Sequence, residues 1–348
     1  GSWPMANSTE APEDDYEVFI EDDLTDNPAP PAKYDASILS AQLVPQLYLS
    51  VFMVGLLGNM LVVLVLMRYK GLRHVENIYF LNVAISNVCF LLALPFWAHT
   101  AGHGGLLGNS MCTAVVGFYS LGLYSVALGN ILLTVQRYLV AFNMRCPPAA
   151  RTVACGLVTS AVAWVTVILG TLPESLFYRP PKEGQGDVWS FRKASFLPAE
   201  PFWKHFLTLE MNILGFLFPL FTFVFCYARM RKTLWDSERR SDLFKLVFAI
   251  MVVFLLMWGP YNIALFLSTF REYFSLGDCQ STFNLDKGVQ VTKLVAATHC
   301  CINPFLYVFL DKAFRTHFCH LCKATPQQGC PESAQDTSQE ESNCSSRV

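Results

Sequence analysis

The residue types best suited to chemistry gather near the C-terminal end of the chain, where two cysteines alternate with two histidines. Cys319 and Cys322 form one Cys-x-x-Cys pair, and His317 and His320 interleave with it. Zinc prefers thiolate and imidazole ligands, but its structural sites usually combine two such pairs, and no second pair follows. The remaining sequence offers no nucleophile–base arrangement and no phosphate-binding loop. We therefore expect neither an enzyme nor a bound metal or cofactor.

The elements that must position side chains in this protein are long apolar runs. Hydrophobic residues make up 53% of the chain and charged residues 15%, too few for an ordinary soluble surface. A bilayer core about 30 Å thick needs about 20 helical residues, and backbone in lipid must satisfy its hydrogen bonds internally. Seven such runs lie near residues 43–67, 77–100, 111–141, 152–176, 206–230, 243–270 and 287–310. The fold class expected is an all-α membrane protein, a seven-transmembrane helix bundle in one domain.

Charge predicts the orientation of this bundle. Residues 1–35 carry ten acidic side chains against the single Lys33. Basic residues flank three loops between the spans: Arg68, Lys70, Arg73, Arg145, Arg151, Arg229, Arg231, Lys232, Arg239, Arg240 and Lys245. Because Lys and Arg stay on the cytoplasmic side, these loops face inward, the N-terminus is extracellular and the C-terminus is cytoplasmic. Asn7, in Asn7-Ser8-Thr9, is then a glycosylation acceptor on the outer side.

The same pattern divides the chain into four parts. Residues 1–42 read as a disordered acidic tail and residues 43–310 as the bundle. Residues 311–323 form a short amphipathic stretch at the membrane surface, and residues 324–348 read as a disordered tail. Prolines recur within the apolar runs, where each removes a helix hydrogen bond and predicts a kink: Pro95, Pro173, Pro219, Pro260 and Pro304.

Motifs within the spans resemble the rhodopsin-like (class A) G-protein-coupled receptors over roughly residues 40–322. They are Gly58-Asn59, Leu81-Asn82-Val83-Ala84, Trp164, Pro219 with Tyr227, Trp258-Gly259-Pro260-Tyr261-Asn262 and Asn303-Pro304-Phe305-Leu306-Tyr307. Two further segments resemble the chemokine receptors: Leu94-Pro95-Phe96-Trp97 and His299-Cys300-Cys301-Ile302-Asn303-Pro304. The resemblance implies a receptor for a chemoattractant protein.

Two residues depart from the signalling members of that family. Those members have Asp-Arg-Tyr at the inner end of the third span, where this chain has Gln136-Arg137-Tyr138. They also have a buried Asp where this chain has Asn87. Gln and Asn form hydrogen bonds but do not titrate, and Asn offers a sodium ion only one neutral carbonyl. The resemblance therefore implies weak sodium binding and impaired coupling. The alternative is intact coupling, because Arg137 is retained. A neutral hydrogen-bonding network of Asn87 with Asn59 and Asn303 is compatible with weak sodium binding.

The resemblance also implies a ligand cavity with an unusual charge. Many chemokine receptors carry Glu in the seventh span where this chain has Lys293, so the cavity favours an anionic group such as a ligand carboxyl terminus. The alternative is a lysine that extends to the outer surface. The residues expected to line the cavity are Trp97, Tyr119, Trp258, Tyr261 and Gln290. For the aromatic residues, packing within the bundle is the alternative, with equal weight.

Outside the bundle, the acidic N-terminus resembles sulfated tails that attract basic ligands, with Tyr16 in the best context for sulfation. The family's disulfide partners for Cys112 and Cys279 are missing, so both are expected as unpaired extracellular thiols, with an intermolecular bridge as the alternative. Residues 311–323 resemble the receptors' membrane-surface helix. There we favour acylation of Cys319 and Cys322 over a metal site, because they lie close to the membrane.

The function expected is a cell-surface atypical chemoattractant receptor of the plasma membrane, which binds a chemokine or chemerin and presents or internalises it with weak or no G-protein coupling. Membrane lipid, arrestin at the phosphorylated tail and receptor hetero-oligomers are further expected partners, and nucleic acid is not. The first alternative is a fully signalling chemokine receptor. A transporter is the second, but transporters show paired repeats and discontinuous spans that this sequence lacks.

Overall fold

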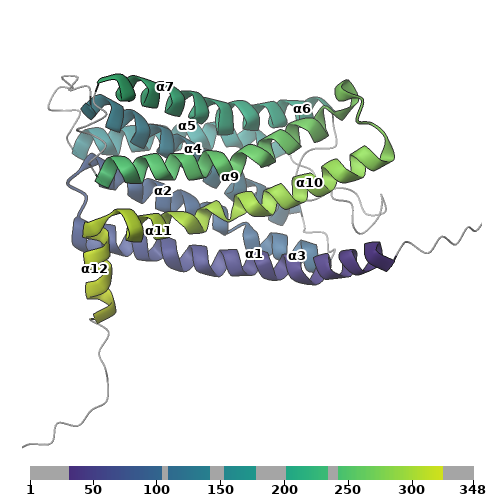
Figure 1. Ribbon diagram of the computed structural model, residues 1–348, viewed down its shortest axis with the longest axis horizontal. Helices are drawn as coiled ribbons and strands as arrows, with labels where there is room; N and C mark the ends of the chain where they lie inside the picture. Colours follow the sequence, from purple (N-terminus) through teal and green to yellow (C-terminus); the bar gives the residue numbers. More distant parts are fainter. Residues whose placement is uncertain (1–30, 104–108, 142–152, 178–200, 234–241, 324–348) are drawn as a thin grey trace, which may run out of the picture.

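The computed structural model describes residues 31–103, 109–141, 153–177, 201–233 and 242–323, and the regular elements in these ranges are all helical (Figure 1). The first span joins α1 (Pro31–Val65) to the π-helix η1 (Leu66–Lys70), and the second joins α2 (Val75–Leu91) to α3 (Leu94–His103). The third span is α4 (Asn109–Ala141), and the fourth is α5 (Val153–Phe177). Within the described residues, seven segments are long and apolar enough to cross a membrane, as predicted.

The fifth span runs through α6 (Pro201–Glu210), the π-helix η4 (Met211–Leu217) and α7 (Phe218–Thr233), and the sixth is α9 (Asp242–Thr269). After the 3-10 turn η5 (Arg271–Phe274), the seventh comprises α10 (Cys279–Ala297) and α11 (His299–Leu310). The amphipathic helix α12 (Lys312–Lys323) follows and turns away from the bundle axis (Figure 1). This helix confirms the prediction of a short helix after the seventh span.

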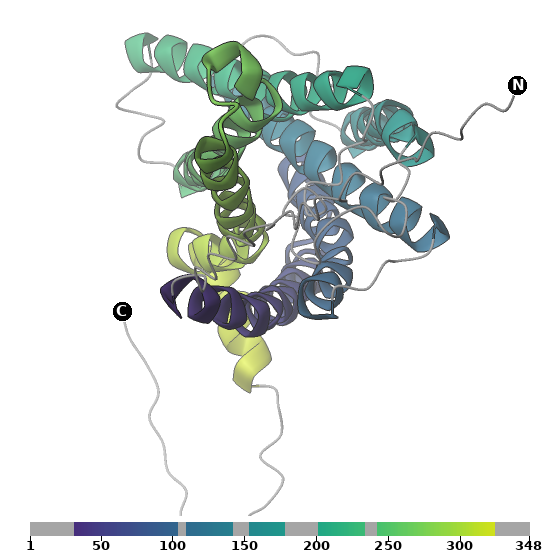
Figure 2. The same ribbon diagram turned by 90° about the vertical axis from the view of Figure 1, so that its right-hand side faces the viewer.

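The third span lies at the centre of the bundle. In its most apolar window 72% of the residues are buried, whereas the corresponding value for the fourth span is 17%. The view in Figure 2 shows the long helices side by side around this interior. Apolar side chains that remain exposed on α1, α5 and α7 therefore lie where lipid would cover them, because a bilayer exposes hydrocarbon to the outer face of such a bundle.

Three of the five predicted proline sites coincide with interruptions in a span. The second span is broken just before Pro95, the π-helix η4 precedes Pro219, and the seventh span is broken between α10 and α11, upstream of Pro304. A proline removes the hydrogen bond to the carbonyl four residues earlier, which for Pro304 is that of Cys300. Asn59 satisfies this carbonyl with its Nδ2 at 2.8 Å. Pro260, in contrast, lies within the continuous helix α9.

Close packing of α2 on α4 depends on Gly122. A Cβ at this position would lie 2.5 Å from the backbone nitrogen of Phe90, which is closer than any real contact. Small residues at helix interfaces let backbones approach in this way. This contact fixes the second span against the third and thereby positions the residues of both.

The start of the first helix differs from the sequence expectation. α1 begins at Pro31, inside the segment 1–42 that was expected to be disordered. Proline is favoured in the first turn of a helix because its fixed φ suits the helix and its missing N–H needs no partner there. Extending a formed helix adds one hydrogen bond for each residue fixed, so the helix continues beyond the apolar run itself.

Candidate functional site

Four aromatic residues expected to line a ligand cavity lie together in the core. Trp97, Tyr119, Trp258 and Tyr261 are each at most 4% exposed. The rings of Trp97 and Tyr119 are 5.1 Å apart and those of Trp258 and Tyr261 are 5.6 Å apart. The Tyr119 hydroxyl donates to that of Tyr261 across 3.4 Å. Three separate spans, the second, third and sixth, are therefore joined at one aromatic cluster.

Lys293 belongs to this cluster. Its side chain is 3% exposed, and its Nζ lies 3.7 Å from the ring centroid of Trp97 and 5.8 Å from that of Tyr119. A cation facing aromatic rings gains about 0.5–2 kcal/mol, the larger values applying when the pair is removed from water. The lysine thus points into the bundle, and the alternative of a side chain extending to the outer surface does not describe this structure. Gln290 is half-buried about one helical turn earlier on α10.

Tyr48 completes the aromatic surround and was not singled out from the sequence. It comes from α1, is 6% exposed, and its ring meets that of Trp97 edge-on at 5.7 Å. A tyrosine inside a long apolar run was the available signal, since a buried hydroxyl usually needs a polar neighbour. The candidate ligand site therefore includes a residue of the first span.

Two asparagines form a neutral polar pair deeper in the bundle. Asn59 donates from its Nδ2 to the carbonyls of Gly55 and Cys300, and Asn87 donates to Asn59 Oδ1 across 3.2 Å. Asn87 is completely buried, and its Oδ1 has no hydrogen-bond partner among the described residues. The expected neutral network therefore exists between Asn59 and Asn87. Asn303, its third expected member, is buried on α11, and within the described residues its side chain is bonded to neither of them.

The Gln136-Arg137-Tyr138 motif lies at the end of the bundle that carries α12. Arg137 is 8% exposed and forms an ion pair with Glu76, with 2.6 Å between Arg137 Nη2 and Glu76 Oε1. Gln136 does not replace the missing Asp as a partner, because its Oε1 is buried without a hydrogen bond among the described residues. The carboxylate that holds this arginine thus comes from α2. Sequence reasoning missed Glu76, although an acidic residue beside a basic loop was a visible signal.

Arg137 also borders a cavity between α4, α7 and α9. Its walls are formed by Thr134, Arg137, Phe223, Cys226, Tyr227, Met230, Phe244, Val247 and Phe248. The ring of Tyr227 lies 5.4 Å from that of Phe248, so α7 and α9 are in contact across this cavity. Tyr138 lies outside the set and packs at 6.0 Å on Phe225.

The last predicted motif residue, Tyr307, links α11 to its neighbours. Its ring meets those of Phe80 and Phe314 at 5.3 and 5.2 Å, and its hydroxyl is buried without a partner among the described residues. Pro304 packs closely on Gly58, where an added Cβ would lie 2.8 Å from the proline ring. The seventh span therefore contacts the first and second spans at this level.

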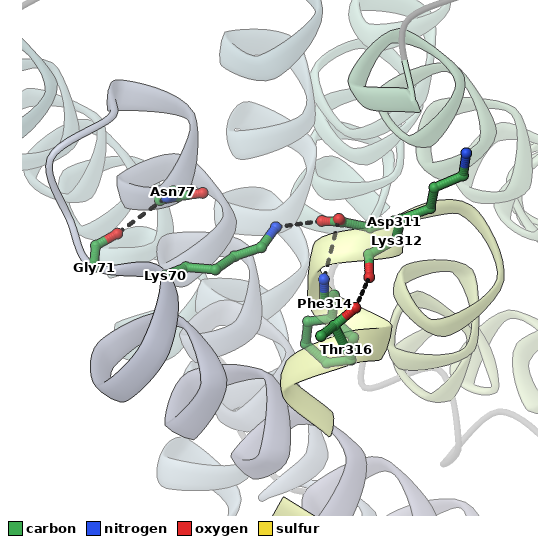
Figure 3. Close-up of polar contacts among 7 residues, drawn as sticks. All are labelled: Lys70, Gly71, Asn77, Asp311, Lys312, Phe314 and Thr316. Atoms are coloured by element: carbon green, nitrogen blue, oxygen red, sulfur yellow. Dashed lines mark hydrogen bonds and ion pairs between the residues drawn. The ribbon is translucent and has the colours of Figure 1, made fainter. Parts of the chain in front are cut away.

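α12 is anchored by Asp311, as Figure 3 shows. One carboxylate oxygen accepts the backbone N–H of Phe314 across 3.2 Å, and the other forms an ion pair with Lys70 of η1. Phe314 is buried beneath the helix, whereas Cys319 and Cys322 are exposed along it. His317 stacks on Tyr69 at 5.3 Å. The described residues contain no group of three or more His, Cys, Asp or Glu side chains placed to hold a metal.

Some predicted residues lie outside the described residues, among them Asn7 and Tyr16, and the side chain of Cys112 is also outside them. Cys279 is described: it is an exposed free thiol at the first position of α10. Asp278 caps this helix by accepting the Ser281 backbone N–H across 3.0 Å. Hydrogen bonds from the Ser281 side chain and backbone keep the pKa of the Asp278 carboxyl below its ordinary value.

Comparison with known proteins identifies the class. Residues 58–307 match the family described as 7 transmembrane receptor (rhodopsin family), so the chain belongs to this family of G-protein-coupled receptors, which are membrane receptors and not enzymes. Chemokine C-C motif receptor-like 2 of Bos taurus is 60% identical over 98% of this chain and 100% of its own length. C-C chemokine receptor-like 2 of Homo sapiens is 57% identical over 99% of this chain and 100% of its own length. The chain is therefore a chemokine-receptor-type G-protein-coupled receptor, a multi-pass protein of the plasma membrane.

Proposed function

We propose that this chain is an atypical chemoattractant receptor, which binds a chemokine or chemerin at the cell surface and presents or internalises it with weak or no G-protein coupling. The observation that carries the proposal is the neutral chemistry of two switch positions. Asn87 is bonded to Asn59 where signalling relatives have a carboxylate, and the side-chain carbonyl of Gln136, next to Arg137, has no hydrogen-bond partner among the described residues. Neither side chain can take up or release a proton during activation.

The ligand class follows from the relatives and from the cavity. The similar proteins are named as chemokine receptor-like, and the N-terminal 35 residues carry ten acidic groups that would steer a basic protein. The buried ammonium of Lys293 would then receive an anionic group of the inserted ligand segment. The proposal keeps the orientation predicted from the basic loops, in which the N-terminus, with Asn7 and Tyr16, is extracellular. Acylation of Cys319 and Cys322 would anchor α12 to lipid, and the tail would meet arrestin.

Capture and signalling can be separated in one experiment. Labelled chemerin and labelled chemokines are applied to cells expressing the receptor, and surface binding, uptake and guanine-nucleotide exchange are measured together. A signalling chemokine receptor expressed at the same surface density is the reference. The proposal expects saturable binding with little exchange. Exchange equal to that of the reference receptor would contradict it.

A fully signalling receptor remains the second candidate, and one observation favours it. Arg137 is retained and still has a carboxylate partner, in Glu76. The charged pair that controls coupling in relatives would then be displaced rather than lost. The same exchange measurement decides between the two candidates.

A further inference from the structure

The surroundings of Arg137 combine two facts that the sequence motif alone does not connect. Its guanidinium is paired with Glu76 at 2.6 Å, and the two side chains are only 10% and 19% exposed. Charge-assisted hydrogen bonds of this kind are short and stronger than neutral ones. The Oε1 of the adjacent Gln136 accepts no hydrogen bond from any residue that the structure describes. The arginine is therefore held from another helix and not from its own neighbour in sequence.

Glu76 is well placed to hold it. It lies in the first turn of α2, where a negative charge is stabilised by the helix dipole. Buried Val75 precedes it, and Asn77 follows it and donates to the Gly71 carbonyl across 3.0 Å, closing the turn from η1 (Figure 3). The residues on both sides of Glu76 are thus fixed, so its carboxylate is presented to α4 with little freedom left to lose.

Arg137 also lines the cavity between α4, α7 and α9, where Tyr227 and Cys226 form part of the wall. A guanidinium bonded to α2 cannot at the same time pair with a group that enters this cavity. Breaking the Arg137–Glu76 ion pair would leave the guanidinium charge largely shielded from water. An unpaired buried charge is strongly unfavourable, so another anionic or polar group would then bind to it.

We propose that Glu76 acts as the displaced counter-ion of this receptor: it holds Arg137 against α2 in the resting state and so keeps the cavity closed to a cytoplasmic partner. Glu76 is a positioning residue in this scheme, acting through Arg137. The inference rests on the role in coupling that the proposed function gives to the Gln136-Arg137-Tyr138 motif, but it requires neither a particular ligand nor weak coupling.

The first test is Glu76→Gln, which keeps the shape of the side chain and removes its charge. Ligand-independent nucleotide exchange should rise about fivefold or more. A fivefold change is the lower end of the range by which one site in a switching protein typically shifts another. Alkylation of Cys226, which is 3% exposed and lines the cavity, should also accelerate, as followed by peptide mass spectrometry in intact membranes. Lys70→Gln is the matched control, because it breaks the other described ion pair at this end without touching Arg137. It should change neither readout.

A second variant adds Gln136→Asp to Glu76→Gln and so supplies Arg137 with a new carboxylate. Basal exchange and Cys226 alkylation should return toward the values of the unmodified receptor. Should Glu76→Gln alone fail to reach the surface, this double variant should restore the surface amount, for the same reason. The inference would be overturned if Glu76→Gln reached the surface in normal amount and changed neither basal exchange nor Cys226 alkylation. It would also be overturned if the double variant restored neither these readouts nor the surface amount. High exchange by the unmodified receptor would contradict only the proposed function.

Discussion

At the scale of single residues, three positions depart in charge from the pattern that the resemblance to the chemokine receptors implies. A cation stands in the aromatic cluster where that pattern has an acid, and two neutral amides stand where it has carboxylates. The structure gives each of these residues a specific neighbour: Lys293 faces Trp97, Asn87 is bonded to Asn59, and Arg137 is paired with Glu76. The electrostatic environment at each position therefore depends on the residue together with its neighbour from another helix.

Lys293→Glu should weaken binding of a ligand that inserts a carboxylate. A buried partner charge is reversed, and such truncations or reversals cost about 2–5 kcal/mol, mostly through faster dissociation. Binding kinetics at two salt concentrations would measure this. Lys287→Glu makes the same charge change at an exposed position of α10 and should alter only the association rate. Equal effects of the two variants would place Lys293 on the rim.

Gln136→Asp together with Asn87→Asp should raise ligand-stimulated nucleotide exchange, because titratable groups return to both switch positions. Asn87→Asp alone should make ligand binding sensitive to sodium, since a buried carboxylate is the oxygen ligand that a hard cation prefers. Exchange assays in sodium and in a large organic cation would compare the variants. A double variant no more active than the unmodified receptor would speak against the switch interpretation.

At the scale of elements, helix contacts depend on a few positions where backbone geometry allows no alternative. Gly122 admits the backbone of Phe90 against α4, and Asp311 both caps α12 and ties it to η1. Each connects two helices that are distant in sequence. Even small substitutions at Gly122 or Asp311 should therefore lower the stability of the receptor measurably.

Gly122→Ala should destabilise the receptor by about 1–3 kcal/mol, the usual cost of forcing an extra methyl group into a packed core. Phe90 backbone atoms, rather than a flexible side-chain end, oppose the new methyl. Gly170→Ala is the matched control, because its Cβ would meet no atom within 4 Å. Thermal unfolding in detergent should show a lower melting temperature for the first variant only.

Asp311→Ala should cost about 0.5–2 kcal/mol, because it removes both the helix cap and the ion pair with Lys70. Hydrogen exchange of α12 amides would report the loosening locally. Thr316→Ala removes only a hydroxyl bonded to the exposed Lys312 carbonyl and should leave α12 within about 0.5 kcal/mol of the original. Protection that is equal in the two variants would mean that the ion pair and cap contribute nothing.

At the scale of the whole molecule, the described helices pack together without a disulfide among the described cysteines. Cys279 is exposed and free at the start of α10. We expect Cys112 and Cys279 to remain unlinked to each other, since their helices occupy different places in the bundle and a disulfide needs Cα atoms within about 7 Å. Mass spectrometry of the alkylated, non-reduced receptor would test this, and one linked peptide pair would refute it.

Sequence alone was sufficient for the bundle. Seven apolar runs define seven spans because lipid leaves the backbone no partner except its own helix. The amphipathic residues 311–323 likewise define α12, and the aromatic residues predicted for the cavity are indeed together. Exact ends were harder to predict: α1 begins at Pro31, and Pro260 lies within a continuous helix, whereas the second, fifth and seventh spans are interrupted near their prolines.

Only the tertiary structure decided which residues become partners across helices. Glu76 is far from Arg137 in sequence, and nothing in the pattern of either helix links them, yet they form the ion pair at the end of the bundle that carries α12. For the same reason, Tyr48 of the first span packs on Trp97 of the second span, and Trp97 in turn faces Lys293 of the seventh. Periodicity fixes which residues a helix contains, whereas the rotation and approach of one helix on another, set by positions such as Gly122, determine which side chains meet.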